Sequence, residues 1–299
     1  MNQQPEMKTM HDPLDATSMP PREILRAPGG QTLSLRPTAV MGIINVTPDS
    51  FSDGGRYTTP ERASARAAAL RAAGAAIIDI GGESTRPGAT PVSTAEELGR
   101  VMPVIERIRA DHPDLMLSLD TSNPAVMQAG LDAGVAMIND VRGLEAPGAL
   151  DVVAATGALV CVMHHQGEPA VMQAAPSYAD IVAEIREYLT QRVNTSIAAG
   201  VSAQQIVVDP GFGFGKRLSH NLSLLGAVDS MSVAGCPVLM GVSRKSMFAK
   251  LYARDTPEAR LNGSLGAAFW AASRGVGIIR AHDVQQTADM VTLAHALTD

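Results

Sequence analysis

Polar and charged residues interrupt the apolar runs of this sequence, and nearly all of them stand at the carboxyl end of a run or just beyond it. The set contains carboxylates, amides, histidines and cations: Asn45, Asp79, Glu83, Asp120, Asn139, His164, Asp209, Ser243, Lys245, Arg280 and His282. A helix cap or a turn explains single members, such as Asp120 or Asp209. It does not explain acids and amides embedded in apolar runs, so the whole set predicts a functional site.

The chemistry of this set falls into two groups. Buried carboxylates and amides suit the N–H donors of a planar ring held between apolar walls, and the residues of this group are Asp79, Asp120, Asn139 and Asp209. Cationic side chains suit a phosphate-type group at the rim, and the residues of this second group are Arg86, Lys245, Arg280 and His282. The sequence therefore predicts a site that binds one polar ring and one polyanion.

Two local motifs do not carry this chemistry. The stretch "GFGFGK" (211–216) resembles a phosphate-binding loop, but Pro210 stands where its first glycine belongs and Arg217 replaces its Ser or Thr. His164 and His165 resemble a metal-binding pair, yet neighbouring residues of a strand point to opposite faces. We therefore do not expect them to share an ion, and we expect one of them to be structural.

The elements that must position these residues alternate between short apolar runs and Ala-rich stretches with helical spacing. Strands are predicted at 39–46, 75–82, 115–120, 136–140, 159–164, 205–210, 238–243 and 277–283. Helices are predicted within 61–74, 94–111, 178–200 and 260–275. Strands that are apolar throughout are covered on both faces. Eight such units favour an α/β fold of the (β/α)8 TIM-barrel class over a doubly wound sheet.

The chain divides into two parts of unequal size. Residues 38–299 form the predicted barrel as a single catalytic domain, and residues 1–37 form an N-terminal extension. This extension begins as a polar, Pro-rich tail without the apolar segment of a secretory signal. It ends in a short hairpin predicted within 27–37, which we expect to cover the N-terminal mouth of the barrel.

Composition narrows the kinds of partner. A net charge of −6, without runs of Lys or Arg, argues against nucleic acid. No apolar stretch is long enough to cross a bilayer, which argues against a membrane protein. Cys161 and Cys236 are the only cysteines and form no CxxC pair, so we expect a reducing, cytoplasmic location.

Longer motifs point to a known family. In chain order they are "NVTPDSFSDGG", "DIGGESTRPGA", "SLDTS", "INDVRG", "DPGFGFGK", "GVSRKSMF", "RLNGSLG" and "IIRAHD". With these motifs the sequence resembles the dihydropteroate synthases of folate biosynthesis over roughly residues 38–297. The resemblance implies a cytoplasmic transferase that is a sulfonamide target and often a homodimer. The implied reaction joins 6-hydroxymethyl-7,8-dihydropterin pyrophosphate to 4-aminobenzoate and releases 7,8-dihydropteroate and pyrophosphate.

The same resemblance assigns roles to single positions. It implies pterin contacts from Asp120, Asn139, Asp209 and Lys245, with Asp79 in support. It implies pyrophosphate contacts from Asn45, Thr85, Arg280 and His282, with Mg²⁺ as cofactor and Asn45 as its protein ligand. It implies an aminobenzoate pocket shaped by Phe51, Pro87, Phe214 and Ser246. The implied catalytic set is Asn45, Asp49, Arg86, Lys245, Arg280 and His282, with Asp49 and Arg86 on two loops that close over substrate.

Two other functions remain open on the sequence. A methyltetrahydrofolate-dependent methyltransferase domain uses a similar barrel with a corrinoid partner, but it would not need the "SRKS" and "RAHD" segments. A catalytically silent paralogue would bind pterin only, and losing Asn45, Arg86 or His282 would favour it, yet all three are present. For the synthase we expect catalysis by positioning and electrostatics, without a Cys or Ser nucleophile.

Overall fold

The computed structural model describes residues 22–47, 59–84, 92–167, 172 and 176–298. Its centre is an eight-stranded parallel sheet in the order β8-β7-β6-β5-β4-β3-β10-β9. The strands are β3 (Ala39–Asn45), β4 (Ile77–Gly81), β5 (Met116–Asp120), β6 (Met137–Asp140), β7 (Leu159–Met163), β8 (Ile206–Asp209), β9 (Leu239–Met240) and β10 (Ile278–Ala281). A parallel bridge between Val208 and Val238 joins the two edges. The predicted (β/α)8 barrel is confirmed.

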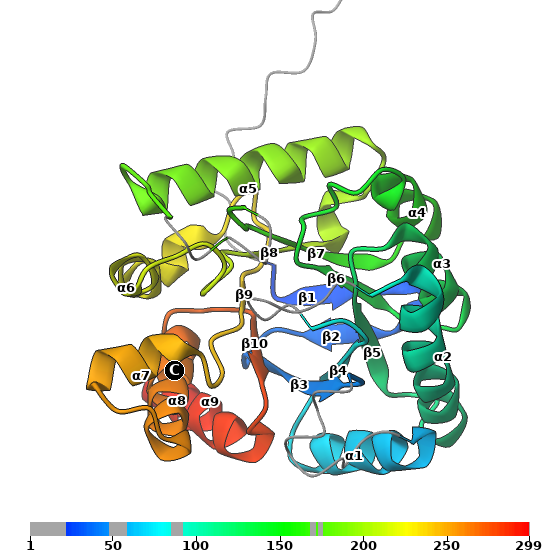
Figure 1. The fold of residues 1–299 in the computed structure, drawn as a ribbon, viewed down its shortest axis with the longest axis horizontal. Helices are drawn as coiled ribbons and strands as arrows, with labels where there is room; N and C mark the ends of the chain where they lie inside the picture. Colours follow the sequence, from blue (N-terminus) through cyan, green and yellow to red (C-terminus); the bar gives the residue numbers. More distant parts are fainter. Residues whose placement is uncertain (1–21, 48–58, 85–91, 168–171, 173–175, 299) are drawn as a thin grey trace, which may run out of the picture.

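Helices surround the sheet and cover its outer face (Figure 1). They are α1 (Pro60–Ala72), α2 (Thr94–Asp111), α3 (Pro124–Asp132), α4 (Ala149–Thr156), α5 (Ile181–Ala198), α6 (Leu218–Gly226), α7 (Ser246–Tyr252), α8 (Pro257–Ser273) and α9 (Val284–Thr298). Several begin at a residue whose side chain accepts from a free backbone N–H, as Thr59, Asn123 and Thr256 do, each followed by a proline that already has helical φ. In the part of the chain that is described, no helix is long and apolar enough to span a bilayer.

Alternate residues of each strand face the barrel interior and the helices. In β4, Ile78 and Ile80 pack in the outer core with the helices, whereas Ile77 packs in a separate inner core. This inner core fills the amino end of the barrel and contains Ala39, Met41, Ile77, Met116, Met137, Leu159, Cys161, Val207, Leu239 and Ile278. Two residues further along β4 the inward position is Asp79. The interior therefore changes from apolar to polar along the strands.

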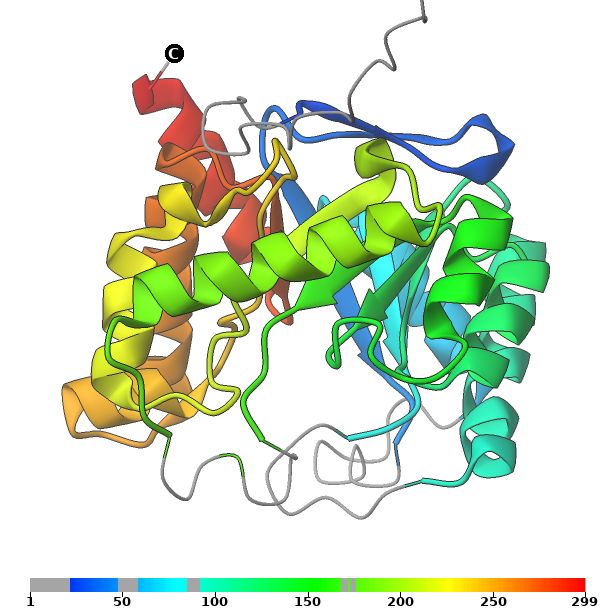
Figure 2. The ribbon, with the colours of Figure 1, turned by 90° about the horizontal axis from the view of Figure 1, so that it is seen from above.

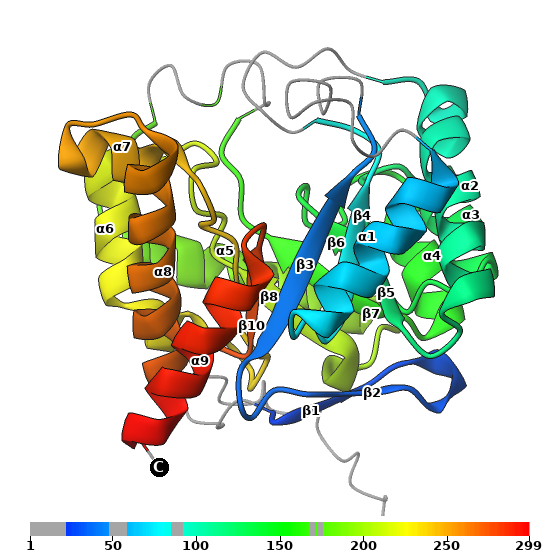
Figure 3. The same ribbon diagram turned by 90° about the horizontal axis from the view of Figure 1, so that it is seen from below.

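An antiparallel hairpin of β1 (Ile24–Arg26) and β2 (Thr32–Ser34) lies across the amino ends of the barrel strands (Figures 2 and 3). Leu25 and Leu33 are paired in register, and both are buried in the inner core. The hairpin was expected within 27–37, but its first strand lies before Ala27, because Pro28–Gly30 form the turn between the strands. The hairpin thus closes the end of the barrel opposite the polar layer.

The hairpin gives the first testable prediction. We expect Leu25→Ala to lower the free energy of unfolding by about 2–5 kcal/mol, because it removes a fully buried side chain from the inner core. Ile24→Ala is the matched control: its side chain is 52% exposed, and the expected change is within about 0.5 kcal/mol. Urea unfolding of both variants measures the difference, and equal losses would contradict this account of the hairpin.

Candidate active site

A largely buried arginine joins three strands of the barrel. Arg280 of β10 donates from Nε to Oδ2 of Asp79 on β4, at 2.6 Å, and from Nη2 to Oδ2 of Asp120 on β5, at 2.9 Å. Asp79 is fully buried, and only 21% of the Arg280 side chain is exposed. Charges this far from water are tolerated only when paired, so the three side chains depend on one another.

Further hydrogen bonds complete the shell of Asp79. Its Oδ1 accepts from the Ser118 hydroxyl at 2.6 Å, and its Oδ2 also accepts from Nδ2 of Asn139 at 3.1 Å. With both oxygens engaged and no surface exposed, Asp79 acts on its neighbours and offers no oxygen to a ligand in this structure. Ser118 was missed by the sequence analysis, although a serine in the middle of the apolar run "LMLSLD" was its signal.

The electrostatics of Asp120 differ from those of an ordinary ion pair. The pKa of Asp120 is raised to about 7, first by burial and then by the nearby carboxylates of Asp79, Asp140 and Glu97, against the opposing effect of Arg280. Arg280 itself keeps a raised pKa, because Asp79 and Asp120 outweigh the effect of its burial. One cation therefore serves two carboxylates, and Asp120 is the one that binds a proton near neutral pH.

The loop after β8 forms a second part of the site. Oδ1 of Asp209 accepts from the backbone N–H of Gly211 at 2.7 Å, and burial raises the pKa of this carboxyl. Lys245, just before α7, donates from Nζ to the carbonyl oxygen of Phe212, and the same Nζ lies 4.6 Å from the ring centre of Phe214. Burial lowers the pKa of Lys245 to about 8, against the attraction of Asp209.

Two further residues stand at the carboxyl ends of their strands. His282 follows β10, and Oγ of Ser243 accepts from its backbone N–H at 3.1 Å while lying 3.0 Å from its Nδ1. Asn45 ends β3 beside Gly81: a side-chain carbon on Gly81 would lie 3.8 Å from Oδ1 of Asn45 and 3.7 Å from Oδ2 of Asp120. Asn45 therefore lies on the side of the barrel that holds the arginine and its carboxylates.

The remaining predicted residues are partly within and partly outside the described residues. Ser246 is exposed at the first position of α7, and Phe214 is half-buried beneath Lys245. His164 is buried, with Nδ1 2.9 Å from Nζ of Lys216, whereas Nε2 of His165 lies 3.7 Å from a carboxylate oxygen of Glu145. The other predicted residues lie outside the described residues: Asp49, Phe51, Thr85, Arg86 and Pro87.

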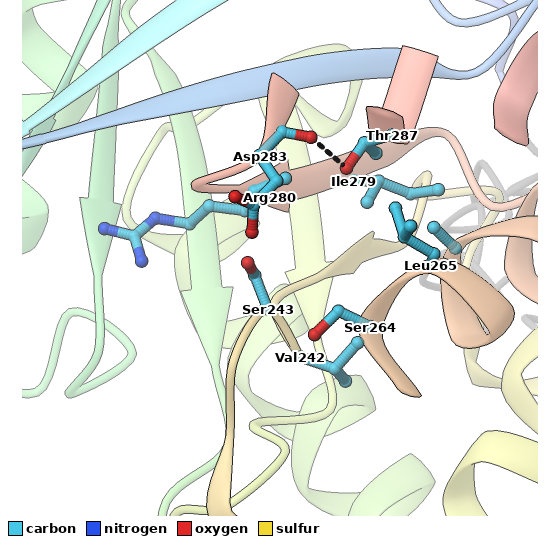
Figure 4. A pocket seen from close by; sticks show the side chains of 10 residues that line it. Val242, Ser243, Ser264, Leu265, Ile279, Arg280, Asp283 and Thr287 are labelled. Atoms are coloured by element: carbon cyan, nitrogen blue, oxygen red, sulfur yellow. Dashed lines mark hydrogen bonds between the residues drawn. The ribbon is translucent and has the colours of Figure 1, made fainter. Parts of the chain in front are cut away.

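A small cavity lies behind the strand that carries Arg280. Its volume is about 10 Å³, and it lies between β10 and helices α8 and α9, where Thr287 donates to the carbonyl of Asp283 (Figure 4). Arg280 extends away from it (Figure 4). This volume accommodates at most a water molecule, so the cavity is a packing defect and not the substrate site.

Fold and site together define a class. The structure is a parallel α/β barrel whose interior carries carboxylates, an amide and an arginine at the carboxyl ends of its strands, which is where barrel enzymes place their active sites. The family described as "Pterin binding enzyme" matches residues 41–282. The chain belongs to this family of pterin-binding enzymes, and within it to the dihydropteroate synthases.

The relatives that support this are numerous and cover nearly the whole chain. Dihydropteroate synthase of Escherichia coli K12 is 47% identical over 267 residues, which cover 89% of this chain and 94% of that protein. The Synechocystis enzyme is 40% identical over 273 residues, covering 90% and 94%. The structure of Xanthomonas albilineans dihydropteroate synthase with 4-aminobenzoic acid has a TM-score of 0.85 at 47% identity and covers 92% of this chain and 98% of that one. The predicted family is therefore confirmed.

The raised pKa of Asp120 gives a second testable prediction. Its pKa in the folded protein is about 7, above the value of 3.8 for an exposed Asp, so the folded state binds this proton more tightly. The contribution of Asp120 to the free energy of unfolding therefore falls as pH rises between these two values. We expect wild type to lose stability relative to Asp120→Asn between about pH 4 and pH 7, the range between the unfolded and folded pKa values of this carboxyl.

Urea unfolding at several pH values measures this difference. Asp114→Asn is the matched control, because Asp114 is an exposed carboxylate paired with Arg71 at the surface. If the difference between wild type and Asp120→Asn stayed constant over that range, the carboxyl of Asp120 would be ionised throughout and Arg280 would dominate its environment.

Proposed function

We propose that this chain catalyses the dihydropteroate synthase reaction. A bond forms between the amine nitrogen of 4-aminobenzoate and the methylene carbon of the dihydropterin, and the bond from that carbon to pyrophosphate oxygen breaks. The amine gives up a proton, and the products are 7,8-dihydropteroate and pyrophosphate. The observation that carries the proposal is the arginine-centred polar layer at the carboxyl end of the barrel, in a chain 40–47% identical to enzymes of that name.

The pterin ring would bind in the polar layer. Its ring N–H and amino groups need acceptors in a buried setting, and Asp120, Asn139 and Asp209 can provide them from β5, β6 and β8. Lys245 would donate to a ring oxygen or nitrogen, since its Nζ lies above the loop that follows Asp209. Asp79 would support the site indirectly, by accepting hydrogen bonds from Arg280 and Asn139.

The pyrophosphate would bind at the rim, against Arg280, His282, Asn45 and Thr85. Two N–H groups of Arg280 are used by the carboxylates, and its remaining donors are available for an anion. Because Ser243 accepts from the backbone of His282, its hydroxyl proton is free to bond Nδ1. With the hydroxyl donating to Nδ1, the imidazole proton would be on Nε2, where it would donate to a phosphate oxygen.

The 4-aminobenzoate would lie over the half-buried ring of Phe214, near Ser246. Phe51 and Pro87 would complete this pocket, and Asp49 and Arg86 would act from the two loops expected to close over substrate. Dihydropteroate synthase of Yersinia pestis has been solved with a sulfonamide drug. We infer that this chain binds sulfonamides in the same pocket.

The residues present fit Mg²⁺ as cofactor. Within the described residues, no group of three or more His, Cys, Asp or Glu forms a metal cage, and Asn45 offers its Oδ1 at the carboxyl end of β3. Mg²⁺ needs few protein ligands, because it keeps several waters and binds substrate phosphates. Asn45 would hold the ion, which when bound would neutralise charge on the pyrophosphate.

Catalysis would rest on charge and position. Charge develops on the pyrophosphate as it leaves, and Arg280 with His282 would stabilise it in a partly water-excluded site. The methylene left behind is conjugated with the electron-rich ring, and an aromatic amine is unprotonated at neutral pH, so no strong base is needed. Cys161 lies in the inner core, where burial raises the pKa of its thiol, so it is no nucleophile.

Assembly and location are also part of the proposal. Exposed large apolar side chains occur on the adjacent helices α6, α7 and α8: Leu222, Leu251, Tyr252 and Trp270. We infer a homodimer through these helices, which sedimentation velocity at micromolar concentration can test. The buried, unpaired Cys161 and Cys236 support a cytoplasmic location.

A product assay tests the function directly. Purified protein with the pterin pyrophosphate, 4-aminobenzoate and Mg²⁺ should yield dihydropteroate and pyrophosphate in equal amounts, and chelation should abolish both. Binding of the pterin without product would contradict the synthase and favour a silent paralogue or a methyltransferase domain.

Substitution of Arg280 tests the mechanism. We expect Arg280→Ala to cost about 2–4 kcal/mol of transition-state stabilisation in kcat/KM, because it removes the cation facing the leaving group. Arg280→Lys keeps the charge but not the pair of hydrogen bonds to Asp79 and Asp120, so its kcat/KM should fall less. Arg71→Ala, a surface arginine paired with Asp114, is the matched control. Circular dichroism checks folding, and unchanged kcat/KM in folded Arg280→Ala would remove this role.

A further inference from the structure

The loop between β8 and α6 encloses a buried lysine. Lys216 is 3% exposed, and its Nζ lies 2.8 Å from the carbonyl oxygen of Gly211, 3.0 Å from that of Phe214 and 2.9 Å from Nδ1 of His164. As an ammonium group it donates to all three, and as a neutral amine it donates to the carbonyls and accepts from Nδ1–H. In either state the amino group uses its full hydrogen-bonding capacity inside the loop.

The loop needs the hydrogen bonds from Lys216, because its glycines allow many backbone conformations. Gly211, Gly213 and Gly215 all have positive φ, at 69°, 80° and 63°. Gly211 also lies directly against the chain after β7, since a side-chain carbon there would come 1.8 Å from the carbonyl oxygen of His164. Glycines allow this path but do not enforce it. Lys216 bonds both ends of the stretch from Gly211 to Phe214 and so restrains it.

This stretch supports the residues that the proposed function assigns to both substrates. Asp209 accepts from the backbone N–H of Gly211, whose carbonyl Lys216 holds. Lys245 donates to Phe212, and Phe214 provides the ring beneath it. A shift of the loop would therefore move the acceptor, the donor and the aromatic wall together.

We propose that Lys216, oriented by His164, is a positioning residue that holds the 211–214 segment in the shape required for pterin and aminobenzoate binding. The inference rests on the proposed function, because it takes the roles of Asp209, Lys245 and Phe214 from there. Lys216 touches neither substrate. Its effect passes through backbone carbonyls, and a small displacement of binding groups is enough to weaken binding.

Lys216→Met is the first test, because methionine keeps the length of the side chain and loses the donors. We expect the Kd for the pterin pyrophosphate, measured by calorimetry, and the KM for 4-aminobenzoate to rise about tenfold, with a smaller change in kcat. A purely structural role would lower the amount of folded enzyme, and therefore Vmax, with Kd and KM unchanged. Lys250→Met, an exposed lysine on α7, is the matched control.

His164 provides a second test that is less disruptive. The amide of asparagine places an oxygen or nitrogen where Nδ1 stands, whereas leucine places none. We expect His164→Leu to raise Kd and KM, and His164→Asn to restore them to within about threefold of wild type. This pair decides the matter if Lys216→Met does not fold.

The outcomes separate the two proposals. Wild type without product would overturn the proposed function, and the calorimetric Kd would still test Lys216. Folded Lys216→Met with wild-type Kd and KM, or equal constants for His164→Leu and His164→Asn, would overturn the positioning role.

Discussion

The structure depends on one largely buried cation, Arg280, placed between a fully buried carboxylate and a second one that is mostly buried. Arg280 lies between Asp79 and Asp120, and removing it would leave two neighbouring carboxylates without their cation in a largely buried site. This requirement ties β10 to β4 and β5 across the barrel. It also explains the presence of Ser118 and Asn139, because each donates a further hydrogen bond to the carboxylate of Asp79. The charges of this cluster neutralise one another inside the barrel. In the proposed function, the same side chains would bind the polar ring and its pyrophosphate.

The barrel keeps this cluster apart from its hydrophobic support. Inward positions at the amino ends of the strands are apolar and are sealed by Leu25 and Leu33 of the hairpin. Further along β4, β6, β8 and β10 the inward positions are polar: Asp79, Asn139, Asp209 and Arg280. The inner core therefore separates the polar layer from the amino end of the barrel, and the outer core separates it from the helices. In the proposed role of Lys216, the loop that it holds adds support beyond the strands, because the loop carries Phe214 and contacts Asp209 and Lys245.

Most of the fold was predictable from the sequence, because apolar runs alternate with helical stretches at a regular spacing. All the predicted barrel strands are present, although β9 is reduced to Leu239–Met240. The strand-end residues were also predictable as a set. The contacts among these residues were not predictable. Both faces of the strands are apolar near the amino end, so periodicity does not reveal which polar residues face inward together. Lys216 was set aside with the glycine-rich motif, since its role depends on a contact with His164, 52 residues away in the chain. Asp49, Phe51, Thr85, Arg86 and Pro87 stay predictions, because they lie outside the described residues.

The most direct measurement is a crystal structure of the protein with the dihydropterin pyrophosphate and a 4-aminobenzoate analogue bound together. The account predicts the pterin ring within hydrogen-bond distance of Asp120, Asn139 and Asp209, and the pyrophosphate against Arg280 and His282. Density for the ring outside this polar layer, with the bonds from Arg280 to Asp79 and Asp120 unchanged, would contradict it.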